Sequence, residues 1–115
     1  MPGPGEVHVR LDACAICHSD ITYMDGDWGG ELPAVYGHEA AGIVQGIGED
    51  VKGLRCGVPV VVTLLRSCGD CFFCRQRQES LCETRFPLDE SSPITDQQGI
   101  PIGHGLRTGA FAEEV

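Results

Sequence analysis

Three stretches of the chain show the hydrophobic patterns of β-strands. Residues 6–15 alternate apolar and polar side chains, which is typical of a strand with one buried face. Residues 40–47 are small and apolar, and residues 58–65 form a continuous β-branched run, the strongest strand pattern in the chain. Another strand is expected to begin within residues 110–115. Together these patterns predict a mostly β fold.

The segments between these strands predict short helices and loops. Residues 16–24 can form a short helix that Asp25 and Gly26 close, and residues 25–33 are a glycine-rich loop. Residues 84–108 are polar and rich in proline and glycine, which predicts a long surface connection. Because no segment has the pattern of a long helix, we expect an irregular β-barrel with few short helices.

Composition limits the chain to one modest domain over residues 1–115. The chain has 115 residues, of which 42% are hydrophobic, enough for one small core. Its net charge of −9 disfavours a nucleic-acid partner, because phosphate binding needs a basic face. No apolar stretch has the length of a membrane span, and residues 1–11 do not have the composition of a signal peptide. A cytoplasmic protein is expected.

Four cysteines lie within fifteen residues of one another. Cys68, Cys71 and Cys74 follow at intervals of three, and seven residues separate Cys74 from Cys82. In a reducing compartment closely spaced cysteines indicate metal ligands rather than disulfides. Four thiolates complete a tetrahedral zinc site and leave no position for water, so such a site serves structure. We therefore expect a structural zinc loop at residues 66–85.

Two alternatives to zinc stay open at this loop. An iron–sulfur cluster is one, because the first three cysteines match the run C-x2-C-x2-C-x3-C-P. The interval before Cys82 is longer than in that run and no proline follows it, so zinc is favoured. Four buried but unliganded thiols are the other. Nearby arginines would offset part of the thiolate charge; these are Arg66, Arg75, Arg77 and Arg85.

A second group of residues has the chemistry of a catalytic zinc site, although each short motif alone is weak. Catalytic zinc keeps three protein ligands and one open position. Cys17 and His38 are suitable ligands, and Glu39 could ligate the ion or lie just behind it. Asp20 could fix the tautomer of a ligand histidine, and the Ser19 hydroxyl could pass a proton outward. Without further support, His38 could equally be an ordinary surface histidine.

At these residues the chain resembles the medium-chain zinc alcohol dehydrogenases. Residues 37–51 fit the family pattern G-H-E-x2-G-x5-G-x2-V at every fixed position. Residues 14–20 are similar to the family's first ligand segment, and twenty residues separate Cys17 from His38, as in the family. The four-cysteine spacing is that of the family's structural zinc loop. Residues 99–115 are similar to the segment that ends the first portion of the catalytic domain.

The resemblance implies a GroES-like β-barrel catalytic domain that works with a Rossmann domain binding NAD or NADP. It implies hydride transfer from an alcohol to the nicotinamide, with one structural and one catalytic zinc. Cys17 and His38 would ligate the catalytic zinc, Ser19 would accept the alcohol proton, and His18 would meet the coenzyme pyrophosphate. Trp28 and Leu64 fall at positions that line the substrate pocket, although Trp28 could simply pack on the core.

The sequence departs from the family in ways that limit this expectation. Gly46-Ile-Gly48 is the only G-x-G near a predicted strand, and no crossover helix follows it, so no Rossmann domain is expected here. The remaining protein ligand of the catalytic zinc is expected beyond Val115. Thr22 stands where some members relay a proton through histidine. We therefore expect a catalytic domain that is inactive without its coenzyme domain. The full-length enzyme, with both domains, is expected to form a homo-oligomer. A non-catalytic zinc-binding domain is the alternative.

Overall fold

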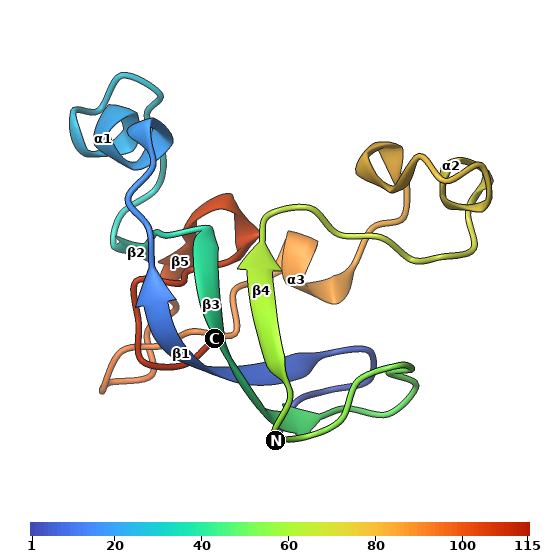
Figure 1. Cartoon of the computed structure of the whole chain (residues 1–115). Coiled ribbons are helices and arrows are strands. Elements are labelled where there is room, and N and C mark those ends of the chain that lie inside the picture. The colour runs from blue at the N-terminus through green and yellow to red at the C-terminus, as the bar shows by residue number, and fades with distance from the viewer.

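A three-stranded antiparallel sheet lies at the centre of the computed structural model, which describes all 115 residues (Figure 1). Its strands are β1 (Val7–Cys14), β3 (Glu39–Ile47) and β4 (Pro59–Thr63), in the order β1-β3-β4. All three coincide with the predicted strands to within two residues at either end. The hydrophobic pattern therefore located the sheet correctly.

The middle strand, β3, contributes two residues to the small core because its side chains alternate between two environments. Ala40 and Val44 are buried on one face, whereas Glu39 and Ala41 are exposed on the other, as the period of two requires. Val44 is only 1% exposed and pairs with Val9 of β1.

Short elements make up the rest of the chain. The helices are α1 (His18–Met24), α2 (Phe72–Arg75) and α3 (Pro87–Glu90), and the 3-10 turns cover Glu79–Leu81 and Gly105–Arg107. A small parallel pair joins β2 (Ala34–Val35) to β5 (Gly103–His104). The predicted helix at residues 16–24 is confirmed as α1, and Asp25 caps its C-terminal end.

The C-terminal residues add to the edge of β1, where another strand was expected. Val9 and Val115 exchange backbone hydrogen bonds of 2.6 and 2.9 Å, and Arg10 forms an isolated bridge with Glu114. The Leu11 N–H also donates to the Glu113 carbonyl at 2.8 Å, but residues 111–113 form a bend, so the contact remains an isolated bridge and not a strand.

Residues 84–108 are more structured than the predicted surface connection. They contain α3, β5 and a 3-10 turn, and Thr108 is buried. A two-residue strand such as β5 is too short to show a hydrophobic period, so the pattern could not reveal it.

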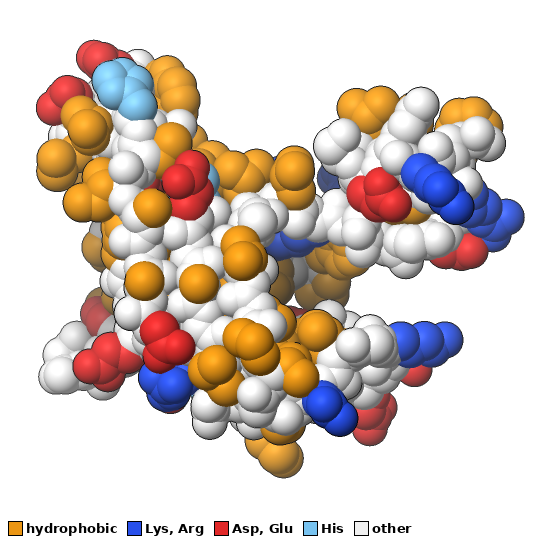
Figure 2. Space-filling model, viewed as in Figure 1, with side chains coloured by type: hydrophobic (Ala, Val, Ile, Leu, Met, Phe, Trp, Pro, Cys, Tyr) orange, Lys and Arg blue, Asp and Glu red, His pale blue; other side chains and the backbone are white.

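Two arms project from the sheet and leave the molecule open (Figure 1). One arm carries α1 and the loop after it; the other carries α2 and the four clustered cysteines. The sheets do not close into a complete barrel, and only 11 of 115 residues are buried, so the apolar core is small. Figure 2 shows hydrophobic side chains on the exposed face of the sheet and a hollow between the two arms. No helix has the length and apolar character needed to cross a membrane.

Candidate metal centres

The four clustered cysteines converge on one point in the second arm, which we call the cysteine lobe (residues 66–85). The Sγ atoms of Cys68, Cys71, Cys74 and Cys82 all lie within 4.8 Å of one another. Cys68 lies 4.0 Å from Cys74, and Cys71 lies 4.0 Å from Cys82, measured between sulfur atoms. Zinc–sulfur bonds of about 2.3 Å in a tetrahedron place the sulfurs about 3.8 Å apart. The lobe therefore has the dimensions of a four-thiolate zinc site.

The local backbone explains how one short segment gathers these thiols. The chain turns tightly after Cys68, so that the backbone N–H groups of Asp70 and Cys71 point at its sulfur, at 3.4 and 3.2 Å. Cys71 then caps α2, and one turn of that helix carries Cys74 into the interior of the lobe. Cys82 follows the 3-10 turn and closes the group.

The thiols of the lobe differ in acidity. The Thr84 hydroxyl, helped by the backbone N–H groups of Asp70 and Cys71, lowers the pKa of Cys68 to about 6. Burial raises the pKa of Cys74 to about 12. Cys68 is therefore a thiolate at neutral pH, ready to capture a cation, whereas Cys74 must release a proton when a metal binds.

The arginines of this region divide between two tasks. Arg75 pairs with Asp70 at 2.7 Å, and the neighbouring thiolates of Cys68 and Cys71 contribute to raising its pKa, so its charge offsets theirs. Arg66 instead contacts Asp89 at 2.5 Å at the base of the lobe. The sequence predicted that all four arginines would offset thiolate charge, whereas Arg66 pairs with a carboxylate instead.

A second group of ligand atoms lies where α1 meets β3. The Cys17 sulfur, a ring nitrogen of His38 and a carboxylate oxygen of Glu39 lie within 4.8 Å of one another. The His38 side chain is only 4% exposed, and its Nε2 lies 3.8 Å from the Glu39 Oε1. These three residues, 22 positions apart along the chain at most, form a compact N, O and S donor set on one side of the imidazole.

Asp20 lies on the other side of the His38 ring. Its Oδ2 accepts a hydrogen bond of 2.8 Å from the Cys17 N–H, which fixes the start of α1. Its Oδ1 lies 3.5 Å from the His38 Nδ1, and neither of these two buried atoms has another partner. A proton on Nδ1 facing Asp20 leaves the Nε2 lone pair, on the side of the Glu39 carboxylate, free to bind a cation. This is the arrangement by which carboxylates orient metal-binding histidines, so the residues present fit a zinc ion.

The backbone around Gly37 holds His38 in this position. Gly37 adopts a φ of +95°, and a Cβ there would lie 2.6 Å from the backbone nitrogen of Phe111. The N–H groups of Ala110 and Phe111 donate to the carbonyls of Gly37 and Tyr36, at 2.9 and 2.7 Å. The glycine of the G-H-E motif is therefore required because the C-terminal segment passes against it.

The other predicted site residues lie at varying distances from this group. Ser19 Oγ is 3.7 Å from the Cys17 sulfur, so its hydroxyl is within the site. His18 is exposed on the first turn of α1. Trp28 is 58% exposed and packs edge-on against Tyr23, with ring centroids 5.1 Å apart.

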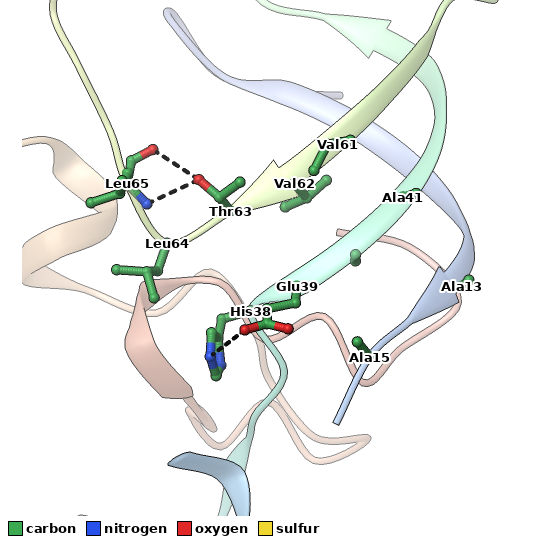
Figure 3. Close-up of a pocket in the computed structure, with 11 residues that line it drawn as sticks. Ala13, Ala15, His38, Glu39, Ala41, Val61, Val62, Thr63, Leu64 and Leu65 are labelled. Carbon is green, nitrogen blue, oxygen red and sulfur yellow. Dashed lines mark hydrogen bonds and ion pairs between the residues drawn. The ribbon is translucent and has the colours of Figure 1, made fainter. Parts of the chain in front are cut away.

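An apolar hollow of about 650 Å³ adjoins His38 and Glu39 on the sheet face (Figure 3). We call it the sheet-face hollow. Its lining residues are Ala13, Ala15, His38, Glu39, Ala40, Ala41, Val61, Val62, Thr63, Leu64 and Leu65. Figure 3 shows the Glu39 carboxylate beside the imidazole and Leu64 reaching toward them. Leu64 was predicted from the family resemblance, but Trp28 does not line this hollow. The contribution of Val61 and Leu65 was missed, because both belong to a continuous apolar run in which no alternation marks the exposed face.

A comparison of the sequence with protein families identifies the family of this chain. The model of the alcohol dehydrogenase GroES-like domain matches residues 3–115. The chain belongs to this family. The fold class expected from the sequence is confirmed as well, since solved structures titled alcohol dehydrogenase share it.

Relatives of this chain include longer proteins that are named alcohol dehydrogenases or alcohol dehydrogenase-like. Alcohol dehydrogenase-like 7 of Arabidopsis thaliana is 36% identical over 97% of this chain and 31% of its own length. The crystal structure of an alcohol dehydrogenase zinc-binding domain protein from Burkholderia ambifaria has a TM-score of 0.83 and 34% identity, over 98% of this chain and 32% of that one. A structure titled CAD from Helicobacter pylori, complexed with NADP(H), has a TM-score of 0.66 and 30% identity, over 98% of this chain and 31% of that one. The GroES-like domain thus spans about a third of the length of these relatives.

Proposed function

We propose that this chain, a single domain over residues 1–115, is the zinc-binding catalytic part of an NAD(P)-linked alcohol dehydrogenase that oxidises an alcohol to an aldehyde or ketone. The buried His38 carries the proposal, because Asp20 faces its Nδ1, Glu39 lies 3.8 Å from its Nε2, and the Cys17 sulfur lies within 4.8 Å of the Glu39 carboxylate and a ring nitrogen. This donor set opens beside an apolar hollow large enough for a small organic substrate. Membership of the alcohol dehydrogenase family supports the reaction type.

Each residue of the site then has a defined task. Cys17 and His38 would hold zinc, with Glu39 as a further ligand or a carboxylate behind the ion. Bound zinc would supply Lewis acidity that makes an alcohol easier to deprotonate. The Ser19 hydroxyl, beside Cys17, would accept the alcohol proton and pass it outward. Asp20 would hold the ring proton on Nδ1, so that Nε2 stays unprotonated, and would fix the orientation of the His38 ring. The sheet-face hollow would hold the apolar substituent of the alcohol.

The coenzyme is proposed to be held by a Rossmann domain outside these residues. The relative whose structure contains NADP(H) is about three times as long as this chain, which supports a separate coenzyme domain. Exposed His18, at the start of α1, would meet the coenzyme pyrophosphate from this side. A cytoplasmic location and a homo-oligomer formed with the coenzyme domain complete the proposal.

The cysteine lobe would bind a structural zinc in the same proposal. Its four sulfurs offer no place for a substrate, and the spacing of about 4 Å suits one tetrahedral ion. Its role is to hold a lobe that has few apolar contacts of its own.

Metal analysis of matched variants tests both sites. We expect two zinc ions per purified chain and one in Cys17→Ser, because the variant weakens only the His38 site. Cys14→Ser is the control: Cys14 belongs to neither ligand group, so two zinc ions should remain. A brown chain that contains iron and sulfide would instead support the iron–sulfur alternative. A wild-type chain with zinc only in the cysteine lobe, and unchanged by Cys17→Ser, would contradict the catalytic site.

A further inference from the structure

The four thiols of the cysteine lobe fall into two close pairs. The sulfurs of Cys68 and Cys74 are 4.0 Å apart, and so are those of Cys71 and Cys82, while no two sulfurs of the group are more than 4.8 Å apart. A disulfide bond is about 2.0 Å long, so each pair would have to close by about 2 Å. That is a small movement for loops that have few apolar contacts.

Bonds within these two pairs would cross one another along the chain. Four cysteines allow three disulfide connectivities. The bonds Cys68–Cys74 and Cys71–Cys82 form the crossed one, because the first encloses Cys71 and the second encloses Cys74. They would tie the turn after Cys68 and the 3-10 turn before Cys82 to α2, so the shape of the lobe would change little.

The lobe is open to a small oxidant. It projects from the sheet as an arm (Figure 1), and three of its cysteines are half-buried, whereas only Cys74 is buried. Phe72, which lies between two of the cysteines in sequence, is 66% exposed, so the first turn of α2 is not covered. A molecule as small as hydrogen peroxide can therefore reach the thiols from solvent.

The other cysteines of the chain are not paired in this way. Their sulfurs contact oxygen atoms at 3.3 to 3.7 Å; these residues are Cys14, Cys17 and Cys56. Both sulfur–sulfur contacts of the chain lie in the lobe. The structure therefore places the chemistry of disulfide formation there.

We infer that the cysteine lobe is a redox switch, which peroxide converts into the disulfides Cys68–Cys74 and Cys71–Cys82. In each pair one thiolate attacks a peroxide oxygen and releases hydroxide, which leaves a sulfenic acid. The second thiolate attacks the sulfenic sulfur, forms the S–S bond and releases another hydroxide. Each pair of thiolates thus gives two electrons to one peroxide. Because metals bind thiolates, the oxidised lobe can no longer hold its ion.

The switch is reversible by the same chemistry. A dithiol exchanges with each disulfide and restores the four thiolates. In reducing compartments, disulfides are usually transient and redox-sensing, as this role requires. Release of an ion rests on the zinc proposed for the lobe, whereas the pairing of the thiols depends on their positions alone.

Oxidation of the zinc-loaded variant Cys17→Ser with hydrogen peroxide tests the switch, because its zinc is expected only in the lobe. A chromophoric chelator follows zinc release, and mass spectrometry of the unreduced chain maps the disulfides. Cleavage before Asp70 and after Phe72 separates the first three cysteines of the lobe, so the three connectivities give different linked peptides. We expect loss of the zinc ion and formation of the two crossed disulfides. Zinc binding should return after reduction with dithiothreitol and resupply of zinc.

Two controls accompany this experiment. Cys56→Ser, added to the same variant, removes an exposed thiol outside the lobe and should change neither the zinc release nor the disulfide map. The metal-free chain should form the same disulfides, so a chain purified without zinc would contradict the proposed function but would still decide the pairing. Uncrossed disulfides, bonds between chains, irreversible loss of the thiols, or zinc retained after oxidation would each overturn the inference.

Discussion

His38 illustrates how single residues decide the chemistry of this domain. An imidazole that is nearly fully buried needs a partner for each ring nitrogen, because unpaired buried polar atoms are costly. Asp20 faces Nδ1, the Glu39 carboxylate lies 3.8 Å from Nε2, and the Cys17 sulfur completes a group of ligand atoms within 4.8 Å of one another. A cation among these three groups would satisfy all of them at once. Metal binding, as proposed, would account for the burial of His38 beside these groups.

Asp20→Asn tests this orientation. The amide keeps the size of the side chain but loses the charge that favours a proton on Nδ1. We expect zinc affinity at the His38 site to fall by about 10- to 100-fold, as is typical when a carboxylate partner is lost, with zinc in the cysteine lobe unaffected. Competition with a chromophoric chelator measures both affinities. Asp12→Asn, which alters an exposed partner of Arg10, is the control; equal effects of the two changes would refute the role of Asp20.

The sequence predicted ligand residues better than it predicted the contacts that position them. The cysteines of the lobe are close along the chain, so their spacing alone indicated convergence. His38 and Cys17 could be related only through family resemblance, because a turn and a glycine-rich loop separate them. The contact of Phe111 with Gly37 joins residues more than seventy positions apart, and no local pattern encodes such a contact.

At the scale of elements, the cysteine lobe is an arm whose base is held by charges. Asp89, in α3, accepts hydrogen bonds from the Phe86 N–H at 2.8 Å and from Arg66 at 2.5 Å, and lies 3.3 Å from Arg107. Arg66 also donates to the carbonyl of Arg107. One carboxylate therefore links the start of the lobe, the helix after it and the C-terminal segment.

Asp89→Asn should weaken this link in a pH-dependent way. The Phe86 N–H, Arg107 and Arg66 lower the pKa of Asp89 below its ordinary value of 3.8. A lowered pKa stabilises the fold above about pH 4, and that contribution is lost as the pH falls through the folded-state pKa. We expect the variant to lose about 2 kcal/mol at pH 7 and to differ less from wild type near pH 3.

Denaturant unfolding at several pH values checks the Asp89 prediction. Asp70→Asn is the matched control, because its carboxylate is 84% exposed and an ion pair so exposed to solvent contributes little to stability. Low pH also releases metal, but it does so in both variants, so their difference isolates Asp89. A constant difference between Asp89→Asn and wild type from pH 3 to 7 would contradict the assignment.

Removing one thiol should disrupt the whole lobe. In Cys71→Ala we expect loss of one zinc ion and a large fall in the thermal midpoint, because the lobe has little apolar core to replace the metal. Cys56→Ala removes an exposed thiol far from either ligand group along the chain and should change the midpoint little. Similar thermal shifts in the two variants would show that the lobe does not depend on a metal.

The whole molecule exposes an unusual amount of apolar surface for its size. Val61 and Leu65 beside the sheet-face hollow are 74% and 61% exposed. The sequence located the three central strands, but it suggested a barrel, whereas the sheet stays open. Hydrophobic periods show which face of a strand is apolar, but they cannot show whether other strands from the same chain cover it.

The chain alone should not oxidise alcohols. No part of it has the glycine-rich strand–turn–helix that holds a dinucleotide, so NAD would have no defined position near His38. Incubation of the zinc-loaded chain with NAD and ethanol should give no rise in NADH absorbance. Addition of a matching coenzyme domain supplies the positive control. Steady turnover by the chain alone would refute the proposal that a separate domain holds the coenzyme.

The hydrogen bonds from Ala110 and Phe111 to Gly37 and Tyr36 have a consequence for synthesis on the ribosome. The cysteine lobe is one contiguous stretch and can enclose its ion once residue 82 has left the exit tunnel. The His38 site must wait for nearly thirty further residues, because its supporting segment at residues 110–111 is translated after the lobe. A nascent chain should therefore acquire its two metals in sequence, first at the lobe and then at the imidazole.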